Sequence, residues 1–148
     1  MKKVFIVGAG QMGLDIGQVM AKAGLEVVFR DMTEEILAKS MAKLEKGLDK
    51  QVAKGRMDEA KKADILSRIS TTTELTPAAD ADLVLEAIVE NVDIKKNLFK
   101  ELDGICKPET IFATNTSSIS ITLIAGATKR EDKFIGMHFF NPATVMKL

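Results

Sequence analysis

Short apolar runs rich in β-branched residues alternate with amphipathic stretches along the whole chain. The apolar runs lie at Val4–Val7, Val27–Phe29, Ile69–Thr71, Asp82–Ile88, Thr110–Thr114 and Lys133–Phe139. Strands that alternate with helices form βαβ units, in which helices cover both faces of a parallel sheet. We therefore predict one α/β domain over residues 1–148, with a doubly wound, mostly parallel sheet of six strands.

The longest amphipathic stretch predicts a helix from about Thr33 to Lys54. Apolar residues recur along it in steps of three and four, at Leu37, Met41, Leu44, Leu48 and Val52. Thr33 is a good N-cap, and Gly55 is placed to end the helix. A second helix over about Asp58–Ser67 follows, so we expect a helical hairpin inserted between the second and third strands.

The first apolar run leads directly into a G-x-G-x-x-G pattern and then into a stretch that favours a helix. Gly8 permits a tight turn, Gly10 lets the backbone approach a pyrophosphate, and Gly13 lets the helix pack closely. The intervening Gln11 and Met12 open the helix, whose N-terminus would face the anion. This pattern predicts a dinucleotide site, although three glycines can also mark an ordinary loop.

Asp31 strengthens the prediction because it closes the second strand, about 20 residues beyond the glycine turn. A carboxylate at this point accepts hydrogen bonds from the adenosine ribose and repels a 2′-phosphate, which favours NAD over NADP. The neighbouring Arg30 weakens that preference. The alternative role for Asp31 is to cap the following helix. We favour a Rossmann-like fold that binds NAD.

The overall charge and the scarcity of cysteine and histidine exclude several other classes. The chain has 21 basic and 21 acidic residues, so it lacks the positive field of non-specific nucleic-acid binding. One cysteine cannot form an intramolecular disulfide, and one histidine with one cysteine is too few for structural zinc. The N-terminal apolar stretch is much shorter than the roughly 20 residues of a membrane span. We expect a cytoplasmic protein without metal, nucleic acid or membrane as partners.

Polar residues gather after the later strands, where open parallel sheets bind their ligands. These clusters are Glu86–Asn91 with Lys95, Asn115–Ser118, and His138–Pro142. A lone histidine in an apolar strand is more often a core residue than a catalyst, but the location of His138 favours catalysis.

Four segments together resemble the short-chain 3-hydroxyacyl-CoA dehydrogenases, and most of all the bacterial 3-hydroxybutyryl-CoA dehydrogenases. They are Gly8–Gly13, Glu86–Asn91, Asn115–Thr122 and Gly136–Ala143. The resemblance covers essentially the whole chain in order, and the last two segments are far more specific than the glycine loop.

The resemblance implies reversible oxidation of an L-3-hydroxyacyl-CoA, with 3-hydroxybutyryl-CoA as the expected substrate, to a 3-ketoacyl-CoA with NAD. His138 matches the general base, a role that suits an imidazole with a pKa of about 6.5. Ser117 matches the hydroxyl that bonds the reacting oxygen, and Asn115 the amide beside the nicotinamide ribose and the substrate. Glu90 and Lys95 match residues that flank the cofactor.

Each of these residues also has a structural alternative. Ser117 or Ser120 could cap the helix that carries Leu123 and Ile124. Glu90 with Lys95 could be a solvated pair at a helix start. We interpret Cys106 as a packing residue.

A row of lysines follows helical spacing on the first helix of the hairpin. It comprises Lys39, Lys43, Lys46, Lys50 and Lys54. Such a row is usually a solvated face. The resemblance suggests instead that Lys50 and Lys54 contact the 3′-phosphate of CoA.

Two features of that family have no counterpart up to Leu148. One is the glutamate that orients the catalytic histidine, and the other is the helical domain that covers the acyl chain and forms a homodimer. The chain ends within an apolar run, so we expect a fragment or a truncated form of a longer protein.

Three functions remain in competition. The chain is the cofactor-binding half of a 3-hydroxyacyl-CoA dehydrogenase, a stand-alone NAD-binding module that acts as a sensor or structural protein, or part of a dehydrogenase for free 3-hydroxy acids. The first is favoured, because the module needs neither His138 nor Ser117, and the Asn-Thr-Ser-Ser and His-Phe-Phe-Asn-Pro motifs argue against the third.

Overall fold

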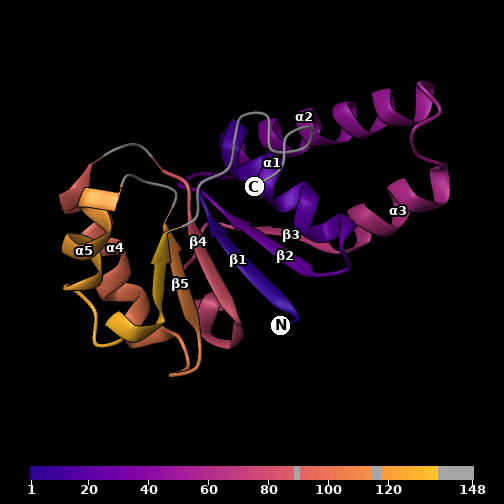
Figure 1. Ribbon diagram of the computed structural model, residues 1–148. Coiled ribbons are helices and arrows are strands. Elements are labelled where there is room, and N and C mark those ends of the chain that lie inside the picture. The colour runs from indigo at the N-terminus through magenta and orange to yellow at the C-terminus, as the bar shows by residue number, and fades with distance from the viewer. Residues whose placement is uncertain (89–90, 115–117, 137–148) are drawn as a thin grey trace.

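The computed structural model of the chain describes residues 1–88, 91–114 and 118–136 (Figure 1). Its strands are β1 (Lys3–Val7), β2 (Glu26–Arg30), β3 (Ile69–Thr72), β4 (Leu83–Glu86), β5 (Ile111–Thr114) and β6 (Phe134–Gly136). Its helices are α1 (Gln11–Lys22), α2 (Glu34–Ala53), α3 (Glu59–Ser67), η1 (Thr76–Asp80), α4 (Val92–Ile105), α5 (Ser118–Ala125) and η2 (Glu131–Lys133).

The six strands form one sheet in the order β3-β2-β1-β4-β5-β6, and every pairing is parallel. The chain therefore builds outward from β1 to one edge and then returns to build the other half from β4. The point where the direction reverses lies between β1 and β4, which is where doubly wound sheets bind ligands. This topology confirms the predicted fold class.

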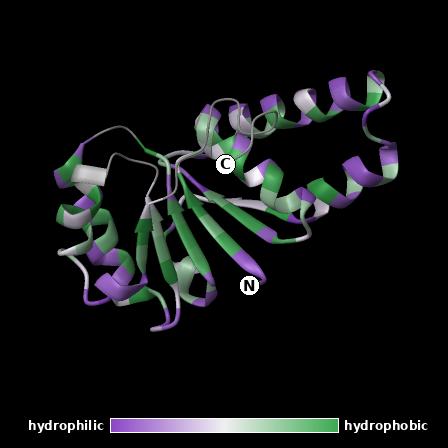
Figure 2. Cartoon of the chain, in the orientation of Figure 1, coloured by the Kyte–Doolittle hydropathy of each residue, from purple (hydrophilic) through white to green (hydrophobic). Residues whose placement is uncertain are grey.

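Two hydrophobic cores lie on opposite faces of the sheet, because side chains alternate along each strand. In β1, Val4 and Ile6 face one core, and Phe5 and Val7 face the other. The first core is closed by α1, α2 and α3, and the second by η1, α4 and α5 (Figure 1). Figure 2 shows the strands hydrophobic along most of their length and hydrophilic positions on the outer surfaces of the helices.

The segment between β2 and β3 forms the helices α2 and α3, which extend together beyond the sheet (Figure 1). The hydroxyl of Thr33 caps α2 by accepting the N–H of Ile36 at 3.1 Å. Gly55 ends the helix with a φ of +71°, which favours glycine. An ion pair between Asp49 and Lys62 joins the two helices.

Three predicted strands begin one residue before the strands that form, at Asp82, Thr110 and Lys133. The run Asp82–Ile88 pairs only as far as Glu86, whose carboxylate accepts the N–H of Ile88 at 2.7 Å and so turns the chain out of the sheet. The run Lys133–Phe139 begins one residue late, because Lys133 belongs to η2, and its last three residues lie outside the described part of the chain.

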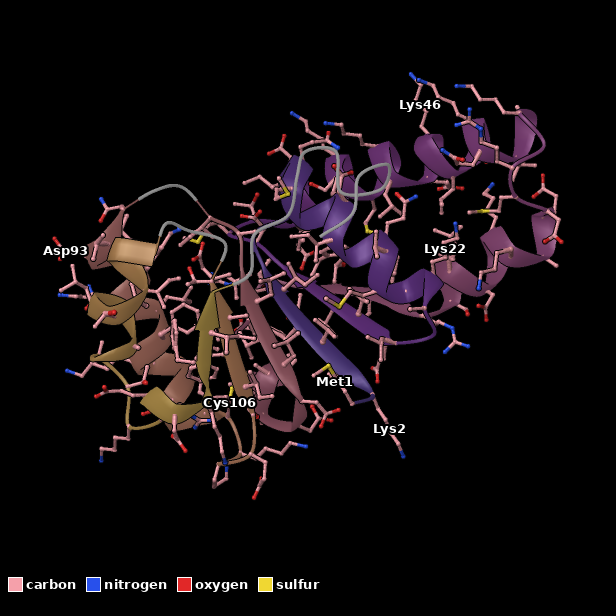
Figure 3. All side chains as sticks on the ribbon, in the orientation of Figure 1. Met1, Lys2, Lys22, Lys46, Asp93 and Cys106 are labelled. Carbon is pink, nitrogen blue, oxygen red and sulfur yellow. The ribbon has the colours of Figure 1, made fainter. Side chains whose placement is uncertain are left out.

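Cys106 ends α4 and is buried, close to the strands in Figure 3. Burial raises the pKa of its thiol to about 11, so the thiolate that would react is not populated near neutral pH. The packing role predicted for Cys106 is confirmed. Among the described residues, no helix combines the length and apolar character that crossing a membrane requires.

Candidate cofactor site

The turn between β1 and α1 depends on two of its glycines. Gly8 has a φ of +106°, and its N–H donates to the carbonyl of Arg30 at 2.8 Å. A Cβ on Gly8 would lie 2.6 Å from the carbonyl oxygen of Ala87, and a Cβ on Gly13 would lie 2.0 Å from the carbonyl oxygen of Gly8. The sequence predicted both requirements, a tight turn and a close helix.

Gly10 is different, because a Cβ placed on it would meet no atom within 4 Å. It is the N-cap of α1 and provides no side-chain hydrogen bond, whereas α2, α3 and α4 are capped by Thr33, Asp58 and Asn91. The first N–H groups of α1 are therefore left without a capping side chain, beside open space. This arrangement fits a pyrophosphate.

Gln11 and Met12 have side chains that point away from this open space. The Gln11 amide donates to Asp15 Oδ1 at 2.9 Å, and Met12 packs against the core beneath α1. Both residues therefore offer a ligand their backbone N–H groups at the start of the helix. A glycine that sequence reasoning overlooked, Gly17, has the same kind of role as Gly13. A Cβ there would lie 2.2 Å from the ring of Phe29, so this glycine sets the contact of α1 with β2.

Asp31 connects the end of β2 to the glycine loop. Its Oδ2 accepts the N–H of Ala9 at 2.9 Å, and its Oδ1 accepts the N–H of Met32 at 2.8 Å. The alternative that Asp31 caps the next helix is wrong, because Thr33 has that role. The carboxylate is held in place at the mouth of the cleft described next.

A cleft of about 490 Å³ opens at the carboxyl ends of β1, β2 and β4. It is lined by Val7, Gly8, Gly10, Arg30, Asp31, Met32, Ala87, Ile88, Ile94 and Leu98. Its apolar residues, among them the exposed Met32 and Ile94, were not singled out from the sequence. Only the fold shows that these exposed apolar side chains lie beside the glycine loop. Arg30 is held at the rim by a hydrogen bond of 3.1 Å from its Nε to the carbonyl of Thr73.

A buried polar network lies behind this cleft. Glu86 is fully buried at the end of β4 and pairs with the Lys95 ammonium of α4 at 3.1 Å. The hydroxyl of Thr114 donates to the same carboxylate from β5. The alternative that Lys95 belongs to a solvated surface pair is wrong, since only 1% of it is exposed.

The remaining predicted residues fall into two groups. Glu90, Asn115, Ser117 and His138 lie outside the described residues. Lys50 and Lys54 are exposed at the far end of α2 and its C-cap, away from the cleft lining.

Comparison with known proteins agrees with this geometry. The family model for the NAD-binding domain of 3-hydroxyacyl-CoA dehydrogenase matches residues 3–148. A 3-hydroxybutyryl-CoA dehydrogenase of Clostridioides difficile is 51% identical over 146 residues, which are 99% of this chain and 52% of that protein. The mitochondrial hydroxyacyl-coenzyme A dehydrogenase of Homo sapiens is 48% identical over 153 residues, with 99% of this chain and 49% of that protein covered.

A solved structure gives the same result. The crystal structure of (S)-3-hydroxybutyryl-CoA dehydrogenase from Ralstonia eutropha matches with a TM-score of 0.96 at 45% identity, covering 100% of this chain and 52% of that one. The chain thus spans about half the length of the relatives it matches. The glycine loop lies where the strand order reverses, and the family model matches nearly the entire chain. The chain therefore belongs to the 3-hydroxyacyl-CoA dehydrogenase family, as the NAD-binding domain.

Proposed function

We propose that the chain is the cofactor-binding half of an NAD-dependent enzyme that interconverts L-3-hydroxyacyl-CoA and 3-ketoacyl-CoA, with 3-hydroxybutyryl-CoA as a substrate. The observation that carries the proposal is the cleft itself. An uncapped helix start, an open Gly10 and a fixed carboxylate at Asp31 lie around one apolar cavity.

Each part of NAD has a matching surface in this cleft. The adenine would pack among Met32, Ile88 and Ile94, and its ribose hydroxyls would donate to Asp31. The pyrophosphate would lie over Gly10 at the start of α1, where unpaired N–H groups and the helix dipole favour an anion. Lys95 would flank the cofactor from behind the cleft, where its ion pair with Glu86 holds the ammonium in place.

The chemistry is assigned through the resemblance to the family. NAD supplies the hydride acceptor. His138 would take the hydroxyl proton of the substrate, Ser117 would donate a hydrogen bond to the reacting oxygen, and Asn115 and Glu90 would position the substrate and the nicotinamide ribose. These four residues follow the carboxyl ends of β4, β5 and β6, the same edge of the sheet at which the cleft opens.

The substrate and the assembly complete the proposal. Several similar proteins are named 3-hydroxybutyryl-CoA dehydrogenase, which supports an acyl-CoA substrate. Lys50 near the end of α2 and Lys54 at its C-cap are exposed cations that would contact the 3′-phosphate of CoA. We place the longer protein in the cytoplasm as a homodimer that associates through its helical domain, with no membrane or nucleic-acid partner.

Two measurements test this function. Calorimetric titration of the 148-residue chain should show binding of NAD, and weaker binding of NADP. NADH oxidation driven by acetoacetyl-CoA should be very weak with this chain and substantial with a protein of about twice its length. NAD binding without any turnover by the longer protein would favour the stand-alone module instead. Absence of NAD binding, or tighter binding of NADP, would reject the cofactor assignment.

A further inference from the structure

A buried serine on α2 is bonded to the glycine loop. Ser40 is only 9% exposed, and its hydroxyl donates to the carbonyl of Ala9 at 2.6 Å, across 31 residues of sequence. Figure 1 shows α2 beside α1, and the packing of the two helices brings this serine to the start of α1. Ser40 is not among the residues that line the nucleotide cleft, so any effect of this serine on a cofactor passes through the loop.

The bond from Ser40 completes the fixation of Ala9. The N–H of Ala9 donates to Asp31 at 2.9 Å, its methyl group is buried in the core, and its carbonyl accepts from Ser40. The Ala9 carbonyl and the Gly10 N–H belong to one peptide unit, which is planar and trans, so the two groups point in opposite directions. Because the carbonyl is directed at Ser40, the Gly10 N–H points away from α2.

Gly10 lines the nucleotide cleft, and within the described chain its N–H has no acceptor. A reversed peptide would present the Ala9 carbonyl oxygen there instead, and that oxygen would repel an anion. Glycine permits such a reversal, because half a turn would take the φ of Gly10 from −75° into the positive region that glycine adopts readily. The loop sequence therefore allows both orientations, and a bond from outside the loop selects one of them.

We infer that Ser40 is a positioning residue for the cofactor, whose hydroxyl holds the Ala9–Gly10 peptide in the orientation that directs the Gly10 N–H toward the pyrophosphate. The inference rests on the proposed NAD site. It gives the hairpin helix α2 a part in cofactor binding without any contact between Ser40 and the cofactor.

The test compares ligands with and without the pyrophosphate on the ¹⁵N,¹³C-labelled 148-residue chain, by NMR titration. Ser40→Ala should bind NAD and ADP-ribose about three- to tenfold more weakly, because one hydrogen bond no longer selects the peptide orientation and only part of the molecules can bind. Adenosine, which carries no phosphate, should bind equally to the variant and to wild type. The carbonyl ¹³C signal of Ala9 should shift, which reports the loss of the bond.

Two further variants separate positioning from a general loss of stability. Ser67→Ala is the matched control, because the Ser67 hydroxyl also donates to a backbone carbonyl at 2.6 Å, that of Asp64 on α3. It should leave the binding of all three ligands unchanged. Ser40→Thr keeps a hydroxyl, so its NAD affinity should return to the wild-type value together with the Ala9 signal. Urea unfolding verifies that each variant is folded, and Ser40→Ala should be less stable because a buried carbonyl loses its donor.

The outcomes distinguish the role of Ser40 from the NAD site itself. Equal NAD affinity in wild type and Ser40→Ala, or an equal loss for NAD and adenosine, would overturn the inference and leave the NAD site in place. A Ser40→Thr variant with the wild-type Ala9 signal but weak NAD binding would overturn it as well. A wild-type chain that binds neither NAD nor ADP-ribose would overturn the proposed function.

Discussion

Asp31 holds Ala9 in place across 22 residues of sequence, with its Oδ2 accepting the Ala9 N–H at 2.9 Å. The bond fixes the glycine loop against the end of β2, and it also fixes the carboxylate that faces the cleft. Asp31 therefore has two functions that a single substitution removes together. The ribose acceptor and the loop anchor are the same group.

Asp31→Ala should lower the affinity for NAD about tenfold to a hundredfold, because hydrogen bonds to a charged group are lost. NADP should be affected less, since the repulsion toward its 2′-phosphate is removed and Arg30 lies beside the cleft. Calorimetric titrations with both nucleotides measure the change in preference. Thr33→Ala is the control, because it removes the α2 cap two residues away and should cost about 1 kcal/mol of stability without changing that preference.

Gly10→Ala and Gly13→Ala form a matched pair that separates folding from binding. A Cβ at position 10 has open space, so the variant should unfold at nearly the same urea concentration as wild type but lose most of its NAD affinity. A Cβ at position 13 would lie 2.0 Å from the Gly8 carbonyl oxygen, so that variant should be destabilised by about 1 to 3 kcal/mol or more. NAD affinity retained by Gly10→Ala would contradict the pyrophosphate position.

The buried pair of Glu86 and Lys95 should show strong coupling in urea unfolding. Glu86→Gln removes a charge that faces the buried Lys95 ammonium, and Lys95→Met leaves a buried carboxylate. Each should cost about 3 to 5 kcal/mol, because each removes an ion pair between two buried groups. The double variant should cost clearly less than the sum of the two. Additive losses would mean that the two groups do not stabilise each other.

The local parts of the site could be predicted from sequence alone. Gly8, Gly13 and Asp31 were found because the turn, the helix contact and the strand end are each encoded within a few residues. The α2 helix was predicted almost to its ends, because Thr33 and Gly55 mark them chemically.

The parts that depend on contacts between distant elements could not be predicted in this way. The burial of Lys95 and its pairing with Glu86 were not predicted, because Glu86 is on another element, at the end of β4. Nothing in the sequence singled out Asp15, and only the packing of α2 over α1 shows that this carboxylate is buried beside a cavity. Ile94 is exposed, and the sequence alone does not show that the fold places it in the cleft beside the glycine loop.

Asp82 should make the stability of the fold depend on pH in the acid range. Its carboxylate accepts the N–H groups of Lys2 and Lys3 at 2.7 and 3.0 Å and the ammonium of Lys107 at 2.9 Å. The Lys2 N–H, then the Lys107 ammonium and the Lys3 N–H, hold the pKa of Asp82 well below its usual range. In the unfolded chain the pKa returns to about 3.9.

A folded-state pKa below the unfolded value stabilises the protein above the unfolded pKa, and the contribution is lost as the pH falls through the folded value. The wild-type free energy of unfolding should therefore decline below about pH 5. Asp82→Asn should be less stable than wild type at pH 7 and should decline less steeply between about pH 5 and pH 3, because one of the carboxylates that bind protons on unfolding is absent. Urea unfolding across this range measures both slopes, with Asp132→Asn as the control for net charge. Parallel slopes for wild type and Asp82→Asn would show that the N-terminal strand is not held by the charge of this carboxylate.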